Sequence, residues 1–319
     1  MKGTRRKEKQ KGTPKIGTWP TPEKDAKREK KYLLVKGEFG LYYRSTRHVG
    51  SSPDGDSAWF RPYNPVLLSD VMGRSAKVNP GGFAQLRYEA IDALELHFER
   101  AEQNHELAVE ARDFNVDKIG FAAEYSPKLY LSVRSATPTL IEGYILTRGI
   151  DRYGRPVSFV FSGTTNRRDG GEYFLDLDWF DQSINAALVK SGSAYPGLYT
   201  TLPKYLRSRT LELISHAQRD MLGIWRQDQS TKGFMVDTLE DLEELAIWPK
   251  LFRRLVTYFN ISETGLENFE PWLRSNVKKD DEVWIVSEGE LGNMHDVIDI
   301  RGNELRMLYP PGDLAIIPQ

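Results

Sequence analysis

The chain has 319 residues, of which 39% are hydrophobic and 28% charged, and its formal net charge is only −1. This composition is sufficient for one large domain or two small ones with a hydrophobic core. Because there is no cysteine, disulfide frameworks, thiolate metal sites and thiol nucleophiles are excluded, and a metal would need oxygen or imidazole ligands. No apolar run has the length of a signal-peptide core or a membrane span, so the sequence predicts a cytoplasmic protein without membrane association.

Residues 1–31 form a basic segment, with 12 lysines and arginines against 4 acidic residues and therefore a balance of +8. The segment is poor in large apolar side chains and cannot bury enough surface to fold alone, which predicts a flexible arm. Such an arm could lie along phosphates by charge attraction or simply keep the protein dissolved.

The next part, residues 32–228, combines strand patterns with later helical patterns. Runs rich in β-branched and aromatic residues predict strands at 32–45, 53–62, 82–94, 128–133, 139–150 and 155–163, and residues 163–180 resemble an inserted hairpin. Helical periodicity with terminal glycines predicts helices at 104–125, 181–195 and 202–225. This order predicts an α+β domain built on a small barrel.

Residues 229–319 differ in composition from the preceding domain. They hold 17 acidic residues against 9 lysines and arginines, a balance of −8, and end in short strand-like runs at 281–289 and 296–318. We interpret them as a small mixed C-terminal domain of acidic character. It could fold over a basic groove and compete with an anionic ligand, bind a protein partner, or simply carry a solvated acidic surface.

Two short motifs carry carboxylates that could work together. Asp54 and Asp56 flank a glycine on a turn, which suits either an ordinary hairpin or oxygen ligands for a hard cation. Arg87, Asp92 and Glu95 follow one strand pattern, and one carboxylate could bind metal while the other takes a proton from water. Strand alternation places Arg87 and Asp92 on opposite faces, so a shared site requires a kink or bulge. Without the kink, these are solvated charges.

Aromatic and arginine side chains mark two further loops. The triplet Tyr-Gly-Arg at 153–155 stands at the mouth of a strand, where the glycine permits a tight turn and Arg155 can fork onto two phosphate oxygens. Tyr195 and Tyr199 lie on a predicted loop between helices. Loop tyrosines can stack a base or bind a phosphate, or they can cover the edge of a core.

Taken together, these motifs resemble the staphylococcal nuclease (thermonuclease-like) family in type, order and spacing over about Gly50 to Asp228. The match also includes the run NAALVKSG at 185–192 and the helix ending in GIW at 223–225. The resemblance implies an α+β fold with a five-stranded OB-type β-barrel and helices. It implies an endonuclease that binds one Ca²⁺ ion and hydrolyses phosphodiester bonds of DNA or RNA, and the lack of a signal-peptide core predicts that it is intracellular.

The resemblance also assigns roles to individual residues. It implies Glu95 as general base, Arg87 and Arg155 on the scissile phosphate, Asp56, Asp92 and the carbonyl of Ala93 as calcium ligands, Asp54 as a ligand through water, and Arg152, Tyr153, Tyr195 and Tyr199 as substrate-binding residues. Where the family usually has Thr-Pro before its glutamate, this chain has alanine and leucine. The missing proline loosens that loop, which affects the placement of the base.

A different class of function stays open. The same barrel could serve as a non-catalytic scaffold that binds nucleic acid or proteins. Scaffolds of that kind usually lose the carboxylates or the arginines, whereas this chain keeps the whole set, and this favours an enzyme. The sequence does not distinguish DNA from RNA.

Overall fold

The computed structural model describes residues 31–41, 53–126, 132–262 and 265–318. Residues 1–30 of the predicted basic arm, most of the strand predicted at 128–133 and the last four residues of the one at 32–45 lie outside these residues. Within the described ranges, no helix combines the length and apolar character needed to cross a membrane.

Five strands close into a β-barrel with mixed pairing, which confirms the predicted barrel and α+β class. The order around the barrel is β1-β2-β3-β8-β7, and β7 returns to β1; the pair β3–β8 is parallel and the other pairs are antiparallel. Side chains alternate along β3, where Ala84, Leu86 and Tyr88 point into the core. The strands are β1 (Tyr32–Gly40), β2 (Ser57–Pro62), β3 (Ala84–Tyr88), β7 (Leu140–Ile150) and β8 (Pro156–Ser162).

The kink required by the sequence lies directly after β3. Ala90 has a φ of +73°, a left-handed conformation that interrupts strand alternation before the short strand β4 (Ala90–Asp92). Strand β4 leaves the barrel and pairs instead with β10 (Tyr195–Gly197). The kink therefore removes the strict alternation that would place Asp92 and Arg87 on opposite faces.

Helices pack beside the barrel, and their ends follow standard capping chemistry. Asn104 accepts a hydrogen bond from the Leu107 N–H at 3.2 Å, and Gly120, with a φ of +113°, ends the same helix. The helices of this part are α1 (His105–Ile119), α2 (Leu177–Phe180), α3 (Ile184–Lys190) and α4 (Lys204–Arg219). A two-stranded sheet of β5 (Ala122–Tyr125) and β6 (Val133–Thr137) follows α1.

The hairpin predicted at 163–180 is wrong. The segment contains only the two-residue strand β9 (Glu172–Tyr173), which pairs with β1, and then the helix α2. Two hydrogen bonds from Lys36 in β1 hold this segment in place. The Lys36 backbone N–H donates to Asp169 at 2.8 Å, and its ammonium donates to the Thr165 carbonyl at 2.8 Å. The segment therefore extends the edge of β1 and does not pair with itself.

The C-terminal part contains two helices and two three-stranded sheets, ordered β11-β15-β14 and β13-β12-β16. Its elements are β11 (Phe234–Met235), α5 (Pro249–Phe259), α6 (Phe269–Ser275), β12 (Glu282–Ile285), β13 (Glu290–Asn293), β14 (Ile298–Arg301), β15 (Glu304–Met307) and β16 (Leu314–Ile316). Short 3-10 helices occur in both parts of the chain. In the barrel part they span Pro65–Leu68 and Gly223–Arg226, and in the C-terminal part Glu240–Leu242, Met294–Val297 and Pro311–Asp313.

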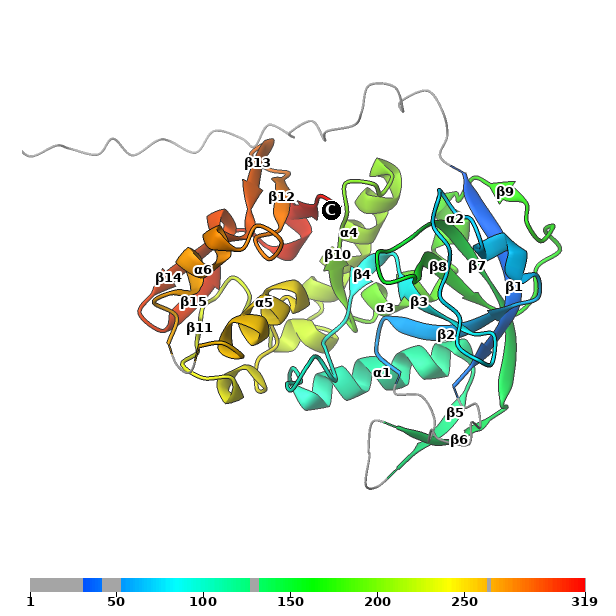
Figure 1. Ribbon diagram of the computed structural model, residues 1–319, viewed down its shortest axis with the longest axis horizontal. Coiled ribbons are helices and arrows are strands. Elements are labelled where there is room, and N and C mark those ends of the chain that lie inside the picture. The colour runs from blue at the N-terminus through cyan, green and yellow to red at the C-terminus, as the bar shows by residue number, and fades with distance from the viewer. Residues whose placement is uncertain (1–30, 42–52, 127–131, 263–264, 319) are drawn as a thin grey trace, which may run out of the picture.

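The C-terminal elements lie beside the barrel, with β4 and β10 between the two parts (Figure 1). Backbone hydrogen bonds join the C-terminal part to the segment after β10. The Ile316 N–H donates to the Leu198 carbonyl and the Thr200 N–H donates to the Ile316 carbonyl, both at 2.9 Å. The buried core continues from the barrel into α5 and β16. The division of the chain into two domains at residue 228 stays a prediction. Hydrogen bonds and a shared core connect the parts before and after this residue.

Candidate functional site

The turn at 54–56 is held close to the next part of the site by packing and by one buried amide. A Cβ on Gly55 would lie 2.7 Å from the Ala93 Cβ and 3.0 Å from the Ala111 Cβ, so only glycine permits this approach. The side chain of Asn115 donates to the carbonyls of Asp54 and Ser57, both at 2.9 Å. The two aspartates of the turn are thereby fixed beside α1.

The loop after β4 is held by hydrogen bonds although it lacks the family's proline. The Ala93 N–H donates to Asp56 Oδ2 at 3.2 Å. The Glu95 N–H donates to Gln103 Oε1 at 3.2 Å, and the Gln103 N–H donates to the Glu95 carbonyl at 2.8 Å. Gln103 is completely buried and was not singled out from sequence, where an isolated glutamine gives no signal. These bonds fix the backbone that carries Glu95.

Asp54, Asp56, Asp92 and Glu95 form one group, which we call the carboxylate centre. Burial raises the pKa of Asp54 well above its ordinary value, and the Glu95 and Asp56 carboxylates raise it further. Burial, together with Asp92 and Glu95, raises the pKa of Asp56 to about 7. The pKa of Glu95 is also raised, by burial and by Asp92, against the opposing charge of Arg253. The structure therefore brings together the four acidic residues that the sequence identified.

A guanidinium from the C-terminal part lies inside the carboxylate centre. Arg253 of α5 forks onto Asp92, with Nη1 to Oδ1 at 3.1 Å and Nη2 to Oδ2 at 2.8 Å, and Nη1 also donates to Glu95 Oε1. Burial would lower the pKa of Arg253, but the Asp92 and Glu95 carboxylates outweigh it and raise that pKa well above its ordinary value. The side chain is 19% exposed and permanently charged.

The carboxylate centre in this arrangement does not fit the expected calcium ion. Calcium takes six to eight oxygen ligands, and the resemblance assigns it oxygens of Asp92 that here accept both arms of the Arg253 guanidinium. Among the described residues, no group of three or more acidic or histidine side chains is placed to hold one metal ion in common. Through Arg253 the C-terminal part contacts an acidic centre with a cation, which differs from one alternative left open by the sequence, an acidic surface that covers a basic groove.

Arg87 and Tyr199 form the wall next to this centre. Arg87 Nη2 donates to the Tyr199 hydroxyl at 2.8 Å, and its guanidinium lies 4.8 Å from the centroid of the same ring. Although burial would raise the pKa of Tyr199, the charges of Lys250 and Arg87 lower it below the ordinary value. Tyr199 thus lies close to the arginine predicted to bind phosphate.

The Tyr-Gly-Arg turn presents two arginines and an exposed aromatic ring. Gly154 has a φ of +88°, which confirms the tight turn expected from its sequence. Arg155 Nε donates to Asp151 Oδ2 at 2.8 Å, and Arg152 Nη2 donates to the Tyr153 hydroxyl at 2.9 Å. The Tyr153 side chain is 56% exposed. The Arg155 charge reaches the carboxylate centre, because it opposes the raised pKa values of Asp54 and Glu95.

Tyr195 lies apart from these surface groups. It is completely buried, and its hydroxyl donates to Asp228 Oδ1 at 2.8 Å. Its ring packs edge-on against Trp225 at a centroid distance of 5.1 Å. In this position Tyr195 covers part of the core, which is the structural alternative that the sequence had left open for it.

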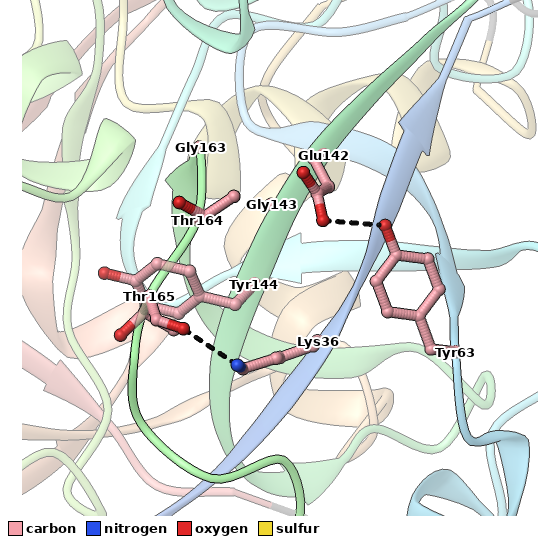
Figure 2. Close-up of a pocket in the computed structure, with 8 residues that line it drawn as sticks. All are labelled: Lys36, Tyr63, Glu142, Gly143, Tyr144, Gly163, Thr164 and Thr165. Atoms are coloured by element: carbon pink, nitrogen blue, oxygen red, sulfur yellow. Dashed lines mark hydrogen bonds between the residues drawn. The ribbon is translucent and has the colours of Figure 1, made fainter.

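A small hollow on the barrel is separate from these residues (Figure 2). Within it, Lys36 donates to the Thr165 carbonyl and the Tyr63 hydroxyl donates to Glu142 at 3.3 Å. The hollow is lined by Lys36, Tyr63, Glu142, Gly143, Tyr144, Gly163, Thr164 and Thr165. None of the residues singled out from sequence lines it, and its polar groups already bind one another.

Comparison of the sequence with protein-family models and with curated proteins gives no match.

Sequence reasoning missed the contribution of α5, which brings Lys250, Arg253 and Arg254 to the inner side of the C-terminal part. A signal was present, because three cations in one short, otherwise apolar segment of an acidic region require nearby acidic partners.

Proposed function

We propose that this chain hydrolyses phosphodiester bonds of nucleic acid at the carboxylate centre, as its resemblance to the thermonuclease-like family implies. One observation supports this proposal above all others: four carboxylates from the 54–56 turn and the loop after β4 lie together, with Arg87 and Arg155 beside them. The closed barrel with its parallel β3–β8 pair also supports assignment to the OB type.

Within this proposal the residues divide into a base and two phosphate-binding groups. Glu95, with its raised pKa, would take the proton of the attacking water as the new oxygen–phosphorus bond forms and the bond from phosphorus to the leaving ester oxygen breaks, with that oxygen protonated from solvent. The phosphodiester is anionic and gains charge on its equatorial oxygens, so the guanidiniums of Arg87 and Arg155 would stabilise that charge. Arg152 and Tyr153 would bind a neighbouring phosphate or base from their exposed turn.

Both the base and the expected calcium ion depend on Arg253. The guanidinium bonds to Glu95 Oε1, and its charge weakens this carboxylate as a base because it opposes the raised pKa of Glu95. Calcium would need the Asp92 oxygens that the same guanidinium occupies. Calcium-dependent hydrolysis therefore requires a state in which the Arg253 side chain has left Asp92.

The bond network of Arg253 also favours a second candidate function. A permanently seated guanidinium would neutralise Asp92 and Glu95 and leave a barrel surface with Arg87, Arg152 and Arg155 for phosphate contacts. Such a protein would bind single-stranded or duplex nucleic acid without cleaving it. This scaffold function is the alternative that the test must separate from hydrolysis.

Digestion assays with purified full-length protein test the proposal. Single-stranded DNA, duplex DNA and RNA are incubated with calcium or with chelator, using wild type, Glu95→Gln and Arg155→Ala. Arg274→Ala is the matched control, because Arg274 pairs with Glu270 on the surface of α6. We expect calcium-dependent cleavage that both site variants lose and the control retains. Binding without cleavage by wild type under every ion tested would favour the scaffold.

A further inference from the structure

Arg253 is mounted on a helix that cannot easily move. Its neighbours Lys250 and Arg254 are buried and both pair with Asp281, through Nζ–Oδ1 at 3.0 Å and Nε–Oδ2 at 2.7 Å. Near the helix start, the Trp248 N–H donates to the Ser230 hydroxyl at 2.9 Å. The backbone of α5 is therefore held by its own ion pairs and hydrogen bonds.

The same segment is bonded directly to the loop that carries the carboxylates. Gln103 Nε2 donates to the Ile247 carbonyl at 2.9 Å, two residues before α5, while Gln103 also binds Glu95 through the backbone and side-chain bonds described above. The distance between α5 and Glu95 is thus set by one buried glutamine. Any exchange at the centre must come from rotation of the flexible Arg253 side chain and not from separation of the two parts.

Arg253 and a divalent cation compete for the same atoms. The guanidinium fork takes both Asp92 oxygens and one Glu95 oxygen, and hard cations bind carboxylate oxygens of this kind. Four carboxylates held in a partly buried position need a cation among them, because buried charges are costly unless they are paired. Arg253 supplies positive charge directly to two of the four, Asp92 and Glu95.

We propose that Arg253 is a built-in, displaceable occupant of the cation position in the carboxylate centre, so that a divalent cation binds only when this side chain swings out. The inference rests on the proposed function only in that it takes the carboxylate centre as the working site. It gives the C-terminal part a specific role: it supplies the competitor that determines how much divalent cation the centre requires.

Calorimetric titration of the full-length protein with calcium chloride tests this inference without any cleavage assay. The variants are wild type, Arg253→Met, Arg253→Lys and the double variant Arg253→Met/Asp92→Asn. Arg274→Met is the matched control, because it removes one positive charge from the exposed surface of the same part. If Arg253 fills the position about nine-tenths of the time, its removal raises calcium affinity about tenfold.

The expected order of calcium affinity is Arg253→Met above Arg253→Lys above wild type, with the control equal to wild type and the double variant losing the gain. The lysine variant keeps the charge without the fork, so it also tests the inference if the methionine variant does not fold. Equal calcium affinity in wild type and both single variants would overturn the inference, as would a gain that the double variant retains. Calcium binding without cleavage by Arg253→Met would contradict hydrolysis but leave this inference intact.

Discussion

Replacing Asp281 with asparagine perturbs the ion cluster that positions α5. Asp281 precedes β12 and accepts from Lys250 and from Arg254, and all three side chains are less than 11% exposed. The substitution keeps the shape of the side chain but removes its charge. Two cations would then remain buried beside a neutral amide.

The expected loss of stability follows from the unpaired cations. Removing one partner of a buried ion pair costs about 3–5 kcal/mol, because the remaining charge stays desolvated without compensation. We therefore expect Asp281→Asn to lower the free energy of unfolding by ~3–5 kcal/mol, a large part of the ~5–15 kcal/mol that typically stabilises a protein. A local loosening of α5 would follow, and Arg253 would be less firmly placed.

Urea unfolding at neutral pH measures this loss against a matched exposed pair. Asp299 binds Arg306 at 2.8 Å on a surface where the arginine is 43% exposed, so Asp299→Asn should cost no more than about 1 kcal/mol. The reasoning is refuted if Asp281→Asn lowers the free energy of unfolding by no more than this control does.

The difference in unfolding free energy between wild type and Asp281→Asn should also depend on pH. Burial would raise the pKa of Asp281, but Lys250 and Arg254 outweigh burial and lower that pKa below its ordinary value of 3.8. A carboxylate with a lowered folded-state pKa stabilises fully above its unfolded-state pKa and loses this contribution as the pH falls through the folded value. The difference in stability between wild type and Asp281→Asn should therefore shrink below about pH 4. A difference that stays constant down to pH 2 contradicts this assignment.

Three further substitutions address the site. Glu95→Gln should reduce cleavage by roughly 10²–10⁴-fold in a single-turnover assay, since it removes the proposed base while keeping the shape; an unchanged rate would assign the base elsewhere. Ala90→Val should lower the free energy of unfolding by ~1–3 kcal/mol in urea, because a β-branched residue resists the left-handed conformation, and Ala90→Gly should cost less. Tyr195→Phe should cost ~1–3 kcal/mol by removing one hydrogen-bond donor to the Asp228 carboxylate, which keeps the bonds from Ser230, with cleavage unchanged; a reduced cleavage rate with intact stability would return Tyr195 to the substrate-binding group.

The barrel could be predicted from sequence because its information is local. Alternating apolar residues mark the strands, and the closed five-stranded arrangement agrees with that prediction. A kink between Arg87 and Asp92 was expected only if the two residues share a site, since they cannot do so on a regular strand, and the structure places it at Ala90. The prediction of a hairpin at 163–180 was wrong because the composition of a strand does not specify which strand it pairs with. In the structure, β9 of this segment pairs with β1.

The carboxylate centre was predictable only in part. Its four acidic residues lie within two short stretches whose order and spacing resemble a known pattern, so sequence could identify them. Arg253 lies 158 residues beyond Glu95, and nothing in the local sequence of either residue indicates the other. Gln103, which links the two parts of the site, makes its decisive bond to a carbonyl 144 residues away.

Net charge averages over buried and exposed positions, so it did not indicate the buried cations of the C-terminal part. Of its cations, Lys250, Arg253 and Arg254 lie on one helix and face acidic groups at short distances, while much of the acidic excess is on exposed side chains. Desolvation makes a buried charge far more informative than a solvated one, since the buried charge persists only with a specific partner. A basic residue in an apolar helix of an acidic region therefore predicts an internal acidic site, and here the exposed majority of the charges hid that site from a prediction based on composition.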